Sequence, residues 1–143
     1  MNKEINNKIA LCNIIDPVAI TATTTSDIID TQGFEALSVV AAMGAGTFDG
    51  SNYVTYKLQE SDTTATGDFT DVASADLVGA FLVVNGVASD ADSVQKVGYI
   101  GTKRYVRLVA TVTATVSSVI SATAILSHAR VDVASNVAIT ATT

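Results

Sequence analysis

The chain has 143 residues, a formal net charge of −6, and only 15% charged against 48% hydrophobic residues. This length fits one domain with a core of useful size. The acidic balance argues against a nucleic-acid-binding protein, because contact with a phosphate backbone requires clustered lysine and arginine. No apolar run approaches the roughly 18 residues of a membrane-spanning helix, so neither nucleic acid nor a membrane is an expected partner. So little charge indicates that another chain covers part of the surface.

The N-terminal part of the chain is interpreted as an arm, residues 1–15. Met1–Lys8 is polar, and the apolar run Ile9–Ile15 comes after it. Asp16-Pro17 is expected to end this apolar run. Cys12 is the single cysteine, which excludes an intrachain disulfide, and its apolar neighbours predict a buried thiol. The first expected strand is the alternating stretch Val18–Thr23.

Two further strands are predicted in the first half of the chain. Phe34–Met43 contains good helix formers, but Leu37, Val39 and Ala41 alternate with other residues as in a strand. Tyr53–Ser61 is clearer, because its apolar residues recur at every second position and its polar residues lie between them. Both segments are therefore expected to bury one face.

A two-residue hairpin is predicted further along the chain. Phe81–Val84 and Val87-Ala88 flank Asn85-Gly86, whose two residues tolerate the positive φ angles of a tight turn. We expect these two short segments to pair with each other.

The most regular stretch is Val97–Leu126. Its first half places Val106 and Leu108 on one face and Tyr105 and Arg107 on the other, which is the period of a half-buried strand. Its second half alternates in the same way from residue 120 to residue 126. A turn is expected between the halves, so the stretch predicts two long strands folded back on each other.

The strand pattern as a whole predicts an all-β fold. We expect about seven to nine short strands in a single antiparallel β-sandwich or jelly-roll-like domain, residues 16–128. It carries an extended N-terminal arm, residues 1–15, and a C-terminal strand or arm, residues 129–143, which could pair with a neighbouring subunit. The chain has no tryptophan and one cysteine, which excludes the Cys–Trp–Cys core of immunoglobulin domains.

No residue pattern predicts catalysis. His128 is the only histidine, and a hydrolytic triad would need it beside a nucleophile. Adjacent strand residues point to opposite faces, so Ser127 is not expected to be the nucleophile beside His128. A histidine at the surface is the preferred interpretation. Glu60 and Asp68 could form a glycosidase pair, but nothing in the sequence brings them together. The protein is therefore expected not to be an enzyme and to need no cofactor.

Loop carboxylates offer a possible calcium site. Asp62, Asp68 and Asp71 form one group, and Asp90 and Asp92 form another. Calcium binds such oxygens, but the spacing does not match an EF-hand. Solvated carboxylates are the better interpretation, and no metal site is predicted.

Four segments carry a family resemblance. They are Tyr56–Asp62 (YKLQESD), Phe69–Val72 (FTDV), Asp76–Gly79 (DLVG) and Val97–Arg107 (VGYIGTKRYVR). In this order they resemble small virion structural proteins of tailed bacteriophages, in which a strand ending in QESDD precedes an F-x-DV turn and a GYxGxKRYxR segment. The similarity covers roughly Gly33 to Ala129.

The resemblance implies a β-sandwich structural protein of the phage head, of the decoration or cement type. The implied partner is the major capsid protein, and the implied place is the capsid surface of a virion assembled in the host bacterial cytoplasm. A homo-oligomer is expected, with a trimer favoured. A tail, connector or host-binding module with the same sandwich is the alternative.

The candidate contact residues are Lys103, Tyr105, Arg107 and Tyr53. Tyrosine and arginine are common anchors of protein interfaces, and Tyr53, Tyr105 and Arg107 are predicted on the face that points away from the core. An equally good explanation for the tyrosines is cross-strand pairing that stabilises the sheet.

Overall fold

The computed structural model describes residues 5–86 and 92–130 of the chain. Three short 3₁₀-helices, η1 (Asn6–Lys8), η2 (Thr66–Asp68) and η3 (Ser74–Asp76), accompany the strands. The strands of this part are β1 (Ile9–Ile20), β2 (Thr24–Thr25), β3 (Ile29–Asp30), β4 (Ala36–Met43), β5 (Tyr53–Ser61), β6 (Thr70–Asp71), β7 (Leu77–Val78), β8 (Ser93–Tyr99), β9 (Tyr105–Thr113) and β10 (Ser118–Ser127).

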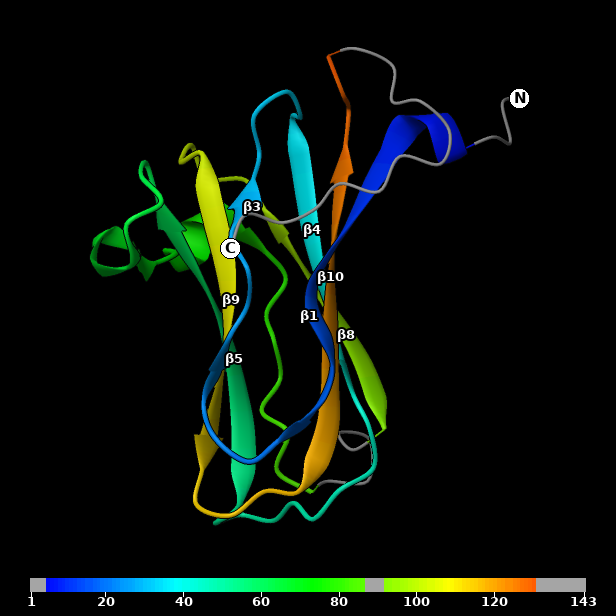
Figure 1. Ribbon diagram of the computed structural model, residues 1–143, viewed down its shortest axis with the longest axis vertical. Coiled ribbons are helices and arrows are strands. Elements are labelled where there is room, and N and C mark those ends of the chain that lie inside the picture. The colour runs from blue at the N-terminus through cyan, green and yellow to red at the C-terminus, as the bar shows by residue number, and fades with distance from the viewer. Residues whose placement is uncertain (1–4, 87–91, 131–143) are drawn as a thin grey trace.

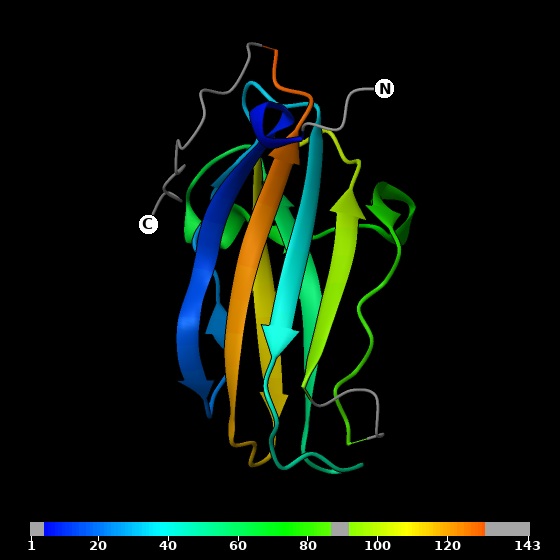
Figure 2. The same cartoon turned by 90° about the vertical axis from the view of Figure 1, so that its right-hand side faces the viewer.

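The strands form two antiparallel sheets that pack face to face, which confirms the predicted all-β sandwich (Figure 1). The first sheet has the order β1-β10-β4-β8-β7. The second has the order β2-β9-β5-β6, and β3 also pairs with β9. Figure 2 shows β1, β10, β4 and β8 side by side across the first sheet.

The core lies between the sheets and follows directly from the alternation in the sequence. In β4, buried and half-buried residues alternate from Ala36 to Met43 without a break. The predicted strand Tyr53–Ser61 is β5, and its predicted apolar face is the buried one. The fully buried positions are mostly β-branched or leucine side chains, which suit a pleated inner surface: Ile20, Ile29, Val39, Val54, Val84, Val97, Val106, Leu108, Val116, Ile120 and Leu126.

The expected hairpin between the last two long strands is wrong. β9 pairs with β5 in the second sheet, whereas β10 lies between β1 and β4 in the first. The chain crosses the sandwich through residues 114–117, beginning at Ala114, whose φ is 57°. A period of two specifies which side chains face the core but not which strand is the partner. Two strands with good alternation can therefore belong to opposite sheets.

Asp16-Pro17 does not separate an N-terminal arm, residues 1–15, from a first strand that begins at Val18, as the sequence had suggested. β1 runs through both residues, so residues 9–15 pair with β10 as part of the first sheet. The ladder is irregular between Asn13 and Ile15 and between Ile15 and Val18. Because β1 lies at the edge of its sheet, a proline without an N–H group is tolerated there. The predicted C-terminal strand or arm lies almost wholly beyond residue 130, outside the described residues.

The predicted Asn85-Gly86 hairpin is not seen in the described residues. Phe81–Val84 forms no strand, and only Val84 makes a bridge, to Val54, through hydrogen bonds of 2.9 and 3.0 Å. Gly86 has a φ of 86°, and a Cβ atom there would lie 2.2 Å from the Phe48 carbonyl oxygen. The glycine therefore serves a close backbone approach. The second arm, Val87-Ala88, lies outside the described part of the chain.

Candidate functional site

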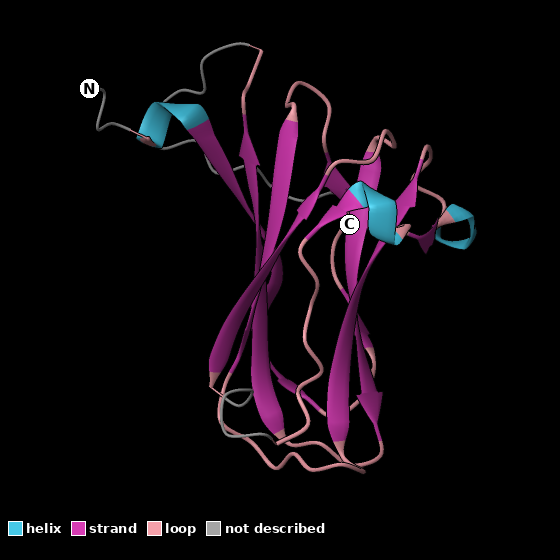
Figure 3. Cartoon of the chain, turned by 180° about the vertical axis from the view of Figure 1, so that it is seen from behind, coloured by secondary structure: helices cyan, strands magenta, loops and turns pink. Residues whose placement is uncertain are grey.

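The four segments that carry the resemblance meet at one end of the sandwich. The end of β5 pairs with β6, and β7 pairs with the end of β8. Figure 3 shows η2 and η3 beside these strands at the same end. We give the name motif cluster to eight of the bonded side chains of these segments: Gln59, Glu60, Asp62, Phe69, Asp71, Tyr99, Lys103 and Arg107.

Arg107 occupies the centre of one half of the motif cluster. It lies opposite Gln59 in the β5–β9 ladder, and its Nε and Nη2 atoms donate to Gln59 Oε1 at 2.9 and 2.8 Å. The guanidinium carbon lies 4.2 Å from the ring centroid of Phe69, which is buried. Arg107 thus fixes the loop that follows β5 through a hydrogen-bonded and a cation–π contact.

Asp71 extends this half of the motif cluster across β6. Gln59 Nε2 donates to Asp71 Oδ1 at 2.7 Å, and Lys57 Nζ donates to Asp71 Oδ2 at 3.0 Å. The hydrogen bond from Gln59, followed by that from Lys57, lowers the pKa of the Asp71 carboxyl below its usual value. The Asp71 carboxylate therefore accepts hydrogen bonds that tie β6 to β5.

Tyr99 occupies the other half of the motif cluster. Its hydroxyl donates to Glu60 Oε2 at 2.5 Å and accepts from the Lys103 backbone N–H at 3.0 Å. The Lys103 ammonium contacts Asp62, and this bond raises the pKa of Lys103. A Cβ atom at Gly101 would lie 2.5 Å from the Tyr99 ring. A glycine at that position therefore allows the loop before β9 to fold over the tyrosine.

The structure brings three of the four predicted contact residues to one region. Tyr105 and Arg107 point outward from β9, and Lys103 lies in the loop before it. Tyr53 is on the same face but at the opposite end of the β5–β9 ladder. At about 3.4 Å per residue this end lies roughly 25 Å away. Tyr53 is therefore separate from the other three.

Tyr105 is held by a neighbouring ion pair. The guanidinium of Arg104 lies 4.9 Å from the Tyr105 ring centroid. It also donates two hydrogen bonds, of 2.9 and 2.8 Å, to the two carboxylate oxygens of Asp30. This pairing lowers the pKa of Asp30. The sequence missed the pair because Asp30 reaches Arg104 only through the pairing of β3 with β9.

Ser127 and His128 lie closer together than the strand pattern predicted. His128 follows the end of β10 with a φ of 54°, and its Nδ1 is 3.1 Å from Ser127 Oγ. The expectation that they point to opposite faces is wrong, because His128 no longer follows the strand. Among the hydrogen bonds and ion pairs of the described residues, none joins a carboxylate to this imidazole. The described residues therefore assemble no Ser-His-carboxylate triad.

The acidic loop residues are bonded to other side chains. Asp62 contacts a lysine, Asp71 contacts a lysine and a glutamine, and Asp68 accepts from the Thr63 hydroxyl at 2.5 Å. Within residues 5–86 and 92–130, no group of three or more His, Cys, Asp or Glu side chains is placed to hold a metal ion. Asp90 lies outside these ranges.

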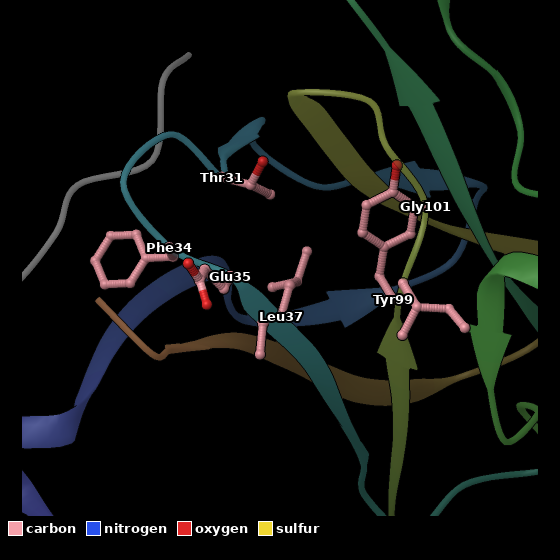
Figure 4. Close-up of a pocket in the computed structure, with 8 residues that line it drawn as sticks. Thr31, Phe34, Glu35, Leu37, Tyr99 and Gly101 are labelled. Carbon is pink, nitrogen blue, oxygen red and sulfur yellow. The ribbon is translucent and has the colours of Figure 1, made fainter. Parts of the chain in front are cut away.

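A small hollow lies beside the motif cluster (Figure 4). Its volume is about 170 Å³, and its lining includes Phe34, Glu35, Leu37 and Tyr99. Sites for small molecules usually measure roughly 300–1,000 Å³, so this hollow is smaller than a typical ligand site. The Tyr99 hydroxyl is already bonded to Glu60.

Two comparisons with known proteins found no match: no family model and no curated protein matches the chain. Among solved structures, the SPBc2 prophage-derived protein YomS is similar with a TM-score of 0.38 and 12% identity, over 82% of this chain and 91% of that one. A Clostridium thermocellum endo-1,4-β-D-xylanase 10B structure with its CBM22-1 and GH10 modules gives a TM-score of 0.37 and 12% identity, over 89% of this chain and 28% of that one. TM-scores this low assign neither ancestry nor activity.

The described residues contain no helix with the length and apolar character needed to cross a membrane.

The two buried tyrosines of the core should respond differently to loss of their hydroxyl groups. Tyr56 packs on Phe81, and its buried hydroxyl has no hydrogen-bond partner in the described structure. Tyr56→Phe should therefore leave the free energy of unfolding unchanged or raise it by about 1 kcal/mol, whereas Tyr99→Phe should lower it by about 1–2 kcal/mol. Urea unfolding of both variants measures this. A Tyr56→Phe variant less stable than Tyr99→Phe would contradict the hydrogen-bond assignments.

Proposed function

We propose that this protein is a non-enzymatic structural component of a phage virion that binds the assembled head as a decoration, or cement, protein. The observation that carries the proposal is the motif cluster. Its polar, charged and aromatic side chains bond to one another across β5, β6, β8 and β9. Such an arrangement builds a rigid outer surface. Its polar groups are bonded to one another, so they are not free to act on a substrate.

The proposed contact with the major capsid protein lies at this end of the sandwich. Lys103, Tyr105 and Arg107 lie near one another there, and all three are half-buried. Arg107 is already bonded to Gln59, so its role is to stabilise the conformation of this surface. Lys103 and Tyr105 offer the accessible groups. Preformed surfaces of this kind bind with little loss of conformational entropy.

The test is binding to expanded capsids that lack the protein. Co-sedimentation should show saturable binding of the purified chain to these shells and none to free capsid monomers. Tyr105→Ala should weaken this binding, while Tyr53→Ala, at the distant end of the same face, should not. Absence of binding to the shells would refute the proposal. Density for the chain on the tail in electron micrographs would instead support the tail, connector or host-binding alternative.

A further inference from the structure

The outer face of the first sheet carries almost no charge. On β10, β4 and β8 the positions that point away from the core hold Ser, Thr, Ala, Val, Ile, Gly and a single lysine, Lys96. The outer face of the second sheet is different, because it carries the Lys57–Asp71 ion pair and the Arg107 guanidinium, which is hydrogen-bonded to Gln59. We call the outer surface of β1, β10, β4 and β8 the first-sheet face.

Apolar side chains on the first-sheet face are well exposed. Leu11 is 50% exposed, Val119 50% and Val94 72%. A chain with a net charge of −6 repels its own copies over most of its surface. Two copies can approach most easily through a broad face on which the outward positions of β10, β4 and β8 hold no aspartate or glutamate.

The first-sheet face has enough area for a dimer. Four neighbouring strands about 4.8 Å apart, with about eight residues each at 3.3 Å, cover roughly 500 Å². Two such faces would bury about 1,000 Å², which reaches the lower limit for a specific interface.

The strand register makes this face complementary to itself. Leu11, Ile125, Ser38 and Gly98 lie in one row across β1, β10, β4 and β8. A two-fold axis parallel to the strands, between β10 and β4, places β1 of one copy over β8 of the other and β10 over β4. Leu11 of each copy then faces Gly98 of the other, and Ile125 faces Ser38. Large side chains meet small ones, as close packing requires.

The next row gives charge complementarity. Asn13, Thr123, Val40 and Lys96 lie side by side across the same strands. The Asn13 amide donates to the Asp16 carboxylate. The same two-fold axis places Lys96 of each copy opposite Asn13 and Asp16 of the other, so the dimer gains two equivalent Lys96–Asp16 contacts.

From these rows we infer that a second copy of this chain packs back to back on the first-sheet face, giving a two-fold dimer in place of the trimer that the resemblance favours. The dimer leaves the motif cluster, which lies on β5, β6 and the 99–107 region, open to another partner. It is independent of the proposed function, because it can be measured without any capsid.

The first test is the mass of the full chain in solution. Sedimentation equilibrium should give a dimer for the wild type and a monomer for Ile125→Asp. Thr111→Asp is the matched control, since it places the same charge at a half-buried position on the outer face of the second sheet, and it should remain a dimer. If circular dichroism shows that Ile125→Asp is unfolded, Val94→Asp takes its place, because this exposed side chain can change without loss of the core.

The second test is a charge exchange. Lys96→Glu and Asp16→Lys should each raise the dimer dissociation constant about tenfold, because each places like charges opposite each other. The double variant Lys96→Glu/Asp16→Lys should return to within about threefold of the wild type. A wild-type monomer at hundreds of micromolar, a trimer that persists in the folded aspartate variant, or a double variant no tighter than the singles would overturn the proposal.

Discussion

Replacing Leu108 by alanine should lower the free energy of unfolding by about 2–5 kcal/mol, the range for a fully buried leucine. Leu108 is 0% exposed and lies at the middle of β9, opposite Leu58. Its backbone also bonds to Ser26, whose N–H donates to the Leu108 carbonyl at 2.8 Å and whose hydroxyl accepts from the Leu108 N–H at 2.9 Å. A domain of this size is stable by about 5–15 kcal/mol in total, so the loss is severe.

Leu82 offers the matched control for this change. Its side chain is 64% exposed, so Leu82→Ala should shift the free energy of unfolding by no more than about 0.5 kcal/mol. Chemical denaturation of the two variants gives both values. Equal losses at the two positions would show that the buried face of β9 is not the core of this fold.

Replacing Arg107 by glutamate should destabilise the domain by about 2–4 kcal/mol and weaken shell binding as well. The change removes the cation–π contact with Phe69 and two charged hydrogen bonds to Gln59. It also places a carboxylate beside the Gln59–Asp71 pair. The sequence marked Arg107 as a candidate contact residue, and these contacts give it a structural part as well.

Lys103 separates the two effects. Its ammonium contacts Asp62 at an exposed position in the loop before β9, and exposed ion pairs contribute little to stability. Lys103→Glu should therefore unfold at nearly the wild-type denaturant midpoint and still bind expanded capsids less tightly. If Arg107→Glu also kept the wild-type midpoint, the structural assignment of Arg107 would be wrong.

Strand positions and buried faces could be predicted where alternation was long. β5 matches the predicted Tyr53–Ser61, and β4 lies within the predicted Phe34–Met43. The two-residue strands β2, β3 and β7 could not be predicted, because so short a segment has no period. The pairing of β9 and β10 also failed, since alternation carries no information about the partner strand.

The motif cluster could also be predicted only in part. The sequence marked Lys103, Tyr105 and Arg107 as residues of interest on a strand and the loop before it. It could not show that Arg107 lies over Phe69, because that contact depends on the register between β5 and β9 and on the path of residues 62–69. Tyr53 was grouped with the other three only because it was predicted on the same outward face. The β5–β9 ladder places it at the end of the strands opposite to Tyr105.

The place of β10 between β1 and β4 sets the order in which the first sheet can form during synthesis. Ile9 pairs with Ser127, so β1 leaves the ribosome long before its partner. At roughly 5–20 residues per second, about 6–24 s separate the two. β1 lacks its neighbour β10 throughout this time, and β4 lacks it from its own synthesis onward. The sheet can close only after translation of β10, which makes the nascent chain a natural substrate for chaperones that cover unpaired strands.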